Sequence, residues 1–131
     1  MVDVVSNLHL LNMFLVLAAG AISGVWGLIL YFSKKAMNGP WRISLIVTAI
    51  VGLLQALFGI VLVLLGRKPP GGNLYYLHYV YGGIVALAIP VALTYATGGK
   101  NPRRDMLIYS LAALILVAAG ARALMTALGL P

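Results

Sequence analysis

Few side chains in this sequence are able to do chemistry, and they can be named individually. The two histidines, His9 and His78, lie in different apolar stretches. Three further polar residues, Asn12, Gln55 and Arg122, also interrupt apolar stretches. An imidazole binds metals, a guanidinium pairs with carboxylates, and amides inside a membrane bond neighbouring helices. These five residues are therefore the candidate functional residues.

The residue types that are scarce exclude several kinds of chemistry. The 131 residues contain no cysteine, which excludes disulfides, iron–sulfur clusters and thiolate metal ligands. The two acids, Asp3 and Asp105, lie outside the apolar stretches, so paired-carboxylate catalysis and a buried ion relay are excluded as well. The hydroxyls of Ser6, Ser23 and Thr48 have no His–Asp partners at a supporting spacing. These residues alone therefore identify no catalytic group, and whether the chain is an enzyme stays open.

The composition is typical of a membrane protein. Hydrophobic residues make up 63% of the chain and charged residues 8%, whereas soluble domains have about 45–50% and about 25%. Nine Lys and Arg against two Asp and Glu give a net charge of +7. In a soluble protein this excess would suggest nucleic-acid binding. Here the basic residues form short clusters between long apolar stretches, which indicates membrane topology and no nucleic-acid partner.

Four apolar stretches are long enough to cross a bilayer, which takes about 20 residues per helix. We place them at residues 8–32, 43–65, 74–97 and 106–129, within one domain that covers residues 1–131. The breaks between them contain Asn-Gly-Pro, Pro-Pro-Gly-Gly, and Gly-Gly with Asn-Pro, all of which favour turns. The predicted fold class is all-α, an antiparallel four-helix transmembrane bundle with contacts to membrane lipid.

The basic residues predict the orientation in the cell membrane. The first and third breaks contain six of them, and the second break two: Lys34, Lys35, Arg42, Lys100, Arg103 and Arg104, against Arg67 and Lys68. Cytoplasmic loops carry the excess of Lys and Arg, so both termini are expected outside. Trp26, Tyr31 and Trp41 would then flank the inner face. Small residues in the first and fourth stretches, such as Gly20 and Ala119, permit close helix contact.

His9 and His78 are expected at one depth on the outer side. Short connections make sequential helices antiparallel, so the first and third helices both enter from outside. At a rise of about 1.5 Å per residue, the two depths differ by one turn or less. Such a pair on alternate helices is the geometry that holds an iron porphyrin edge-on in a bundle. The alternatives are two interfacial residues, or a zinc or copper site that lacks an evident third ligand.

The other intramembrane polar residues each allow two interpretations. Arg122 either extends to the outer surface or pairs with a buried anion, and a haem propionate would supply the carboxylate that the protein lacks there. Gln55 and Asn12 either hydrogen-bond between helices or line a cofactor pocket. Arg67 and Lys68 could meet propionates at the surface.

The chain resembles haem A synthase. The resemblance rests on residues 54–59 (LQALFG), on the Gly/Pro turn that follows an apolar helix end, and on Leu77–His78. The run at 120–122 (GAR) is similar to the family's glycine-then-arginine pattern, and His9 would match the first ligand histidine. The family's usual protein has eight helices, built as two fused four-helix bundles, and this chain is similar to one half. One half of the family's protein binds haem O, which is oxidised to haem A for cytochrome oxidase, and the other holds haem b.

The resemblance implies that His9 and His78 are axial haem ligands and that Arg122 and Gln55 contact the cofactor. Two positions depart from the family's catalytic half: Ser6 stands where an acid precedes the first histidine by one turn, and Leu10 stands where arginine is common. The family's outer-loop cysteine pair is also absent. These departures favour similarity to the haem b half. A homodimer would restore eight helices and four histidines.

Two other functions remain open on the sequence. One is a b-type cytochrome that carries electrons, or an accessory subunit of a respiratory complex, with a respiratory oxidase or a quinone-linked protein as its redox partner. The other is a small transporter or structural membrane subunit without a cofactor. Four-helix multidrug exporters are similar in size but depend on a buried acid in the first helix, which this chain lacks.

Overall fold

The computed structural model describes residues 1–130, and these residues form four α-helices and one short 3₁₀ turn, without a β-strand. The helices are α1 (Val2–Phe32), α2 (Gly39–Leu64), α3 (Tyr76–Tyr95) and α4 (Pro102–Ala127), and the 3₁₀ turn covers Gly72–Leu74. All four helices are long and apolar enough to cross a membrane. The predicted all-helical class with four such helices is therefore confirmed.

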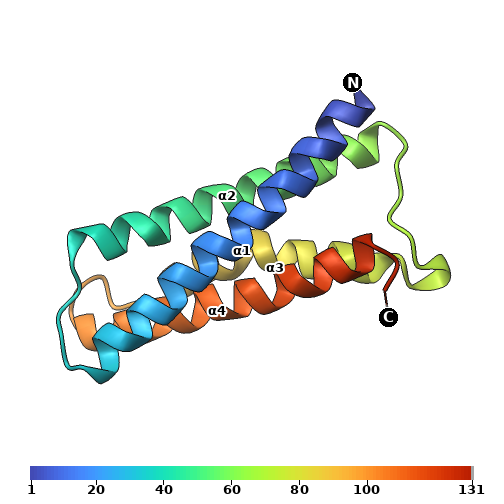
Figure 1. The fold of residues 1–131 in the computed structure, drawn as a ribbon. Coiled ribbons are helices and arrows are strands. Elements are labelled where there is room, and N and C mark those ends of the chain that lie inside the picture. Colours follow the sequence, from blue (N-terminus) through green and yellow to red (C-terminus); the bar gives the residue numbers. More distant parts are fainter. Residues whose placement is uncertain (131) are drawn as a thin grey trace.

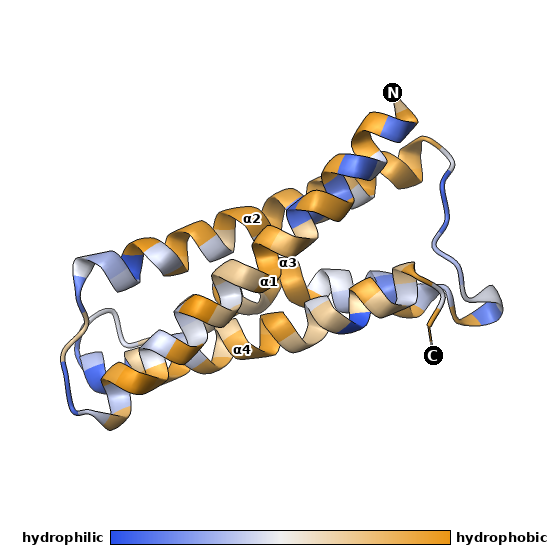
Figure 2. Cartoon of the chain, in the orientation of Figure 1, coloured by the Kyte–Doolittle hydropathy of each residue, from blue (hydrophilic) through white to orange (hydrophobic). Residues whose placement is uncertain are grey.

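The helices form a bundle in which α1 contacts α2 and α4, and α3 contacts the same two helices. The two termini and the α2–α3 connection lie at one end, here called the terminal end (Figure 1). The connections at residues 33–38 and 96–101 lie at the other end, here called the basic end. Hydrophobic residues cover most of the helix surfaces, and hydrophilic residues gather toward the ends (Figure 2).

Three helices begin earlier than predicted. The helix α1 begins at Val2 rather than at residue 8, and α2 and α4 each begin four residues before the expected positions 43 and 106. The Asn-Gly-Pro and Asn-Pro sequences, predicted as turns, are helix starts instead. The Asn38 side chain accepts a hydrogen bond from the backbone N–H of Trp41 at 2.7 Å, and Asn101 caps α4 in the same way. Proline suits the first turn because its missing N–H has no helical partner there.

Glycines in α1 allow close contact with α4. A Cβ at Gly20 would lie 2.7 Å from Val117 Cγ2, and a Cβ at Gly24 would lie 2.6 Å from Leu114 Cδ2. Both distances are shorter than real Cβ contacts, so a larger residue at either position would have to displace the facing side chain of α4. The contact agrees with the role that the small residues of α1 and α4 suggested.

Near the basic end, hydroxyl groups join α1 to α2. Ser23 Oγ lies 3.0 Å from Ser44 Oγ and 2.9 Å from Thr48 Oγ1. The indole N–H of Trp41 donates to the backbone carbonyl of Ser23 at 2.9 Å, and Trp41 is fully buried. The sequence suggested that Trp41 flanks the membrane face, whereas it packs inside the bundle because its N–H has a partner on α1.

Asp105 was expected in a loop and lies instead in the first turn of α4. Its side chain is 3% exposed. The carboxylate accepts hydrogen bonds from the backbone N–H and the hydroxyl of Thr97, at 2.8 and 2.9 Å, and from the N–H of Gly99 at 3.2 Å. Asp105 therefore fixes the α3–α4 connection.

Candidate functional site

The structure brings His9 and His78 together at the terminal end. Their ring centres lie 6.2 Å apart, with an angle of 67° between the ring planes. His9 belongs to α1 and His78 to α3, and both are half-buried. The two helices lie diagonally across the bundle, so the imidazoles face each other across its interior.

Both imidazoles line a cavity of about 580 Å³, here called the histidine cavity. All four helices contribute to its walls, which are mostly apolar. The polar and basic part of the lining consists of Ser6, His9, Gln55, Arg67, Lys68, His78 and Tyr79. Pockets for small molecules and cofactors have volumes of about 300–1,000 Å³ and few polar groups, and the histidine cavity has both properties.

His78 is held in place from α4. Its Nδ1 lies 3.0 Å from the backbone carbonyl oxygen of Ala123 and 2.9 Å from the hydroxyl of Thr126. In a neutral imidazole, an Nδ1–H that donates to a carbonyl leaves the Nε2 lone pair available for a metal. Sequence reasoning missed Thr126 and Ala123 as partners of His78, because nothing in the spacing along the chain relates α3 to that turn of α4.

His9 contacts α2 and has one atom without a partner. Within residues 1–130, His9 Nδ1 is the one buried side-chain nitrogen or oxygen that forms no hydrogen bond. A buried polar atom without a hydrogen bond lowers the stability of the fold by about 1–3 kcal/mol unless a bound group satisfies it. On α2, a Cβ added at Gly59 would lie 3.3 Å from His9 Cε1, so the glycine makes room for the ring.

Gln55 bonds between helices, which is one of the two roles that the sequence left open, and it also lines the histidine cavity. It is 6% exposed, and its Nε2 donates to the backbone carbonyl of His9 at 2.8 Å. The Nδ2 of Asn12 donates to Gln55 Oε1 and to the carbonyl of Val51, both at 2.9 Å. Gln55 also lines the histidine cavity, whereas Asn12 is not among the lining residues. Asn12 therefore joins α1 to α2, and Gln55 joins the helices and faces the cavity.

Arg122 is not among the residues that line the histidine cavity. Its guanidinium carbon lies 5.7 Å from the ring centre of Tyr81, and its Nη1 lies 3.6 Å from Met125 Sδ. The cations in the lining are Arg67 and Lys68, and the Lys68 ammonium lies 4.7 Å from the ring centre of Tyr75. The structure thus brings Gln55 to the two histidines and places Arg122 on Tyr81.

Two glycines of α3 widen the cavity. Gly82 follows His78 by one helical turn, and both Gly82 and Gly83 line the cavity. A Cβ at either position would have no neighbour within 4 Å. The turn-length spacing from His78 to Gly82 is a signal in the sequence from which the two cavity-lining glycines could have been predicted.

No group of three or more His, Cys, Asp or Glu side chains that could hold a metal ion lies in residues 1–130. Comparisons of the chain with protein-family models, with curated proteins and with solved structures found no match.

Proposed function

We propose that the protein is an integral membrane haem protein, an antiparallel four-helix transmembrane bundle in which His9 and His78 are the axial ligands of one iron. The observation that carries the proposal is the facing pair of imidazoles, 6.2 Å apart, in a cavity of about 580 Å³. Neutral imidazole is a common axial ligand of haem, and bundle cores often hold such cofactors.

The spacing of the two rings suits a single iron between them. Metal–imidazole bonds are about 2 Å long, and each ring centre lies about 1 Å beyond the bonded nitrogen, so opposed ligands have ring centres about 6 Å apart. The observed distance of 6.2 Å between the ring centres is close to that spacing. A porphyrin also suits a site with two histidines, because its own nitrogens complete the coordination.

The surrounding residues would orient the ligands and exclude water. The hydrogen bond from Gln55 to the His9 carbonyl fixes that segment of α1, and Gly59 leaves space beside the His9 ring. Ala123 and Thr126 fix the tautomer and orientation of His78. The bound haem would supply reversible one-electron chemistry.

Basic residues in the lining would neutralise the propionates. Arg67 and Lys68 follow α2 at the exposed side of the cavity, and guanidinium and ammonium groups bind carboxylates by charge-assisted hydrogen bonds. Arg122, which the sequence-based proposal assigns to a propionate, lies against Tyr81 and outside the lining of the cavity.

Oxidation of haem O, as in haem A synthase, is a second candidate function. It is supported by Gln55, Gly59 and His78, three of the residues that carry the resemblance, because all three line one cavity. Arg122, which also carries the resemblance, is not in that lining. Ser6 also lines the cavity at the position where the family's catalytic half has an acid. A hydroxyl cannot act as the general base that a carboxylate would provide, so we favour an electron carrier with haem b over the enzyme.

The first test is the visible spectrum of the protein purified in detergent. The wild type should bind a low-spin, six-coordinate haem, whereas His9→Ala and His78→Ala should each lose the haem or yield a high-spin form. Added imidazole should restore the low-spin spectrum of either variant by occupying the vacated position. Ser44→Ala, which removes a hydrogen bond near the basic end, is the control for a loosened bundle and should retain a low-spin haem. A colourless wild type that takes up no added haem would refute the proposal.

The second test separates the enzyme from the carrier. The chain is co-expressed with a source of haem O in cells that lack their own synthase, and the haems are extracted. Haem b alone is the result expected for the electron carrier. Haem A or its hydroxylated intermediate, absent with His78→Ala, would establish the synthase instead.

A further inference from the structure

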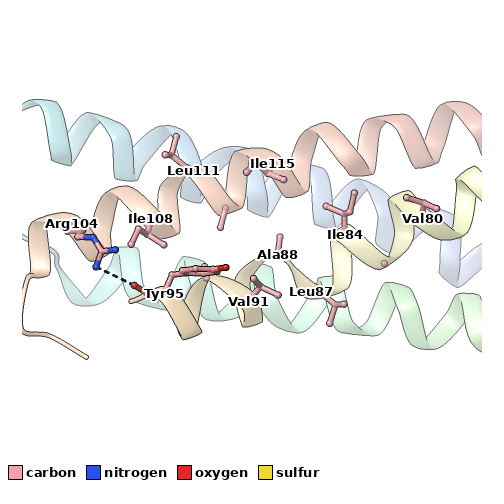
Figure 3. Close-up of a pocket in the computed structure, with 13 residues that line it drawn as sticks. Val80, Ile84, Leu87, Ala88, Val91, Tyr95, Arg104, Ile108, Leu111 and Ile115 are labelled. Carbon is pink, nitrogen blue, oxygen red and sulfur yellow. Dashed lines mark hydrogen bonds between the residues drawn. The ribbon is translucent and has the colours of Figure 1, made fainter. Parts of the chain in front are cut away.

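A second hollow lies on the outside of the bundle between α3 and α4 (Figure 3). It has a volume of about 650 Å³ and shares Gly83 alone with the lining of the histidine cavity. We call it the α3–α4 groove. Its larger apolar lining residues are Ile84, Leu87, Val91, Ile108, Leu111 and Ile115.

The groove exists because small and large side chains alternate around it. Gly83, Ala88, Ala92 and Ala112 leave space between the two helices. Larger neighbours rise on both sides, and Ile115, for example, is 57% exposed. The lining on α3 extends from residue 80 to residue 95, which is about 22 Å at a rise of about 1.5 Å per residue. One leaflet of the hydrocarbon core is about 15 Å deep, so a single acyl chain could lie in the groove along the whole leaflet.

A cation closes the groove at the basic end. Arg104 of α4 reaches across to α3, where its Nη1 lies 3.4 Å from the backbone carbonyl oxygen of Tyr95 (Figure 3). Arg104 is exposed, and it is the one charged residue of the lining. The neighbouring Arg103 lies over the ring of Tyr31, with its guanidinium carbon 4.0 Å from the ring centre. The adjacent carboxylate, Asp105, accepts hydrogen bonds from Thr97 and Gly99, and its charge also acts on Arg104.

We propose that the α3–α4 groove binds an anionic phospholipid, with one acyl chain along the apolar lining and the phosphate at Arg104. The charge distribution favours an anionic over a zwitterionic lipid, because Lys100 and Arg103 add positive charge close to Arg104 along the chain, at the same end of the bundle. The inference rests on the membrane insertion proposed above and not on the haem.

The test is native mass spectrometry of the delipidated protein in detergent, titrated with phosphatidylglycerol or with phosphatidylcholine of the same acyl chains. The wild type should bind phosphatidylglycerol more tightly. Arg104→Gln should weaken the binding of phosphatidylglycerol about fivefold, the effect of one basic residue near an anionic lipid, and leave phosphatidylcholine unchanged. Ala88→Leu should weaken the binding of both lipids, because the added atoms fill the groove.

Arg42→Gln is the matched control, because Arg42 is an exposed arginine at the same end and outside the groove. It should change either affinity less than twofold. Equal affinities of the wild type for the two lipids, or an equal effect of Arg42→Gln and Arg104→Gln, would refute the proposal. So would a dimer that Ala88→Leu abolishes while lipid binding persists, since a second copy would then cover the groove. His78→Ala should bind lipid like the wild type, which separates this result from the test for haem.

Discussion

Replacing Gln55 by leucine tests the link between the α1–α2 hydrogen bonds and the histidine cavity. Leucine has a similar size and a good helix propensity, so the change removes mainly the amide. Two hydrogen bonds to oxygen are lost, from Asn12 Nδ2 to Gln55 Oε1 at 2.9 Å and from Gln55 Nε2 to the His9 carbonyl at 2.8 Å, together with a weaker contact of Nε2 with Met13 Sδ at 3.7 Å. Asn12 retains its bond to the Val51 carbonyl. The Asn12 amide therefore keeps a hydrogen-bond partner, and the expected loss of folding free energy is that of the broken hydrogen bonds themselves.

The expected loss of stability follows from these two bonds. Side-chain hydrogen bonds between membrane helices contribute about 0.6 kcal/mol each on average, so Gln55→Leu should lower the free energy of unfolding by about 1 kcal/mol. A double-mutant cycle with Asn12→Ala isolates the direct contact. Its coupling energy should be about 0.6 kcal/mol, because one bond joins the two side chains.

The measurements are unfolding of the haem-free protein in mixed micelles and haem titration of the refolded protein. Gln55→Leu should also weaken haem binding, because the His9 backbone loses its anchor on α2. Thr48→Val is the matched control on the same helix, since it removes the Thr48 hydroxyl that lies 2.9 Å from Ser23. Thr48→Val should lower the free energy of unfolding by an amount similar to that of Gln55→Leu and leave haem affinity unchanged. A coupling energy of zero would contradict the Asn12–Gln55 contact, and equal haem affinities of both variants would show that Gln55 acts only between helices.

Three further outcomes are expected. Arg122→Leu should reduce haem retention less than the double variant Arg67→Gln/Lys68→Gln does, because Arg122 lies on Tyr81 whereas Arg67 and Lys68 line the cavity. Haem retention is measured as haem loss to an apo-globin acceptor. A larger effect of Arg122→Leu would support its predicted propionate contact. Reporter fusions active only in the cytoplasm should be silent at both termini and active in the connection 33–38, and the reverse pattern would overturn the orientation. Gly59→Leu should abolish haem binding with little loss of helix content by circular dichroism, because a side chain there meets His9, and retention of haem would contradict the geometry of the cavity.

The sequence predicted the number and character of the helices and the candidate histidines. Long apolar stretches separated by turn residues are sufficient to predict the four helices. Because alternate helices of such a bundle run in the same direction, His9 and His78 were expected on the same side. The starts of α2 and α4 came earlier than predicted because Asn38 and Asn101 cap these helices inside segments that were interpreted as turns. In both places a proline lies within the first two residues of the helix rather than interrupting it.

The faces that the helices turn to one another could not be predicted from hydropathy. In a helix that is apolar all round, hydrophobic periodicity does not distinguish the interior from the lipid. Burial of Trp41 depends on a carbonyl of α1, and the orientation of His78 depends on Ala123 and Thr126 of α4. Such partners are fixed by the rotation of each helix about its axis. The positions of small and polar residues indicate which face of a helix packs against its neighbours, as the glycines of α1 do at the contact with α4.

The hydrogen bonds at the terminal end divide the bundle into two pairs of helices. His9 is tied to α2 through Gln55, and His78 is tied to α4 through Ala123 and Thr126. Toward this end the pair α1–α2 diverges from the pair α3–α4 (Figure 1), and the histidine cavity has walls from both pairs. Each pair therefore presents one imidazole on a fixed support. An iron bound by both imidazoles would join the pairs where they separate, and it would stabilise the folded bundle because the unfolded chain lacks the paired site.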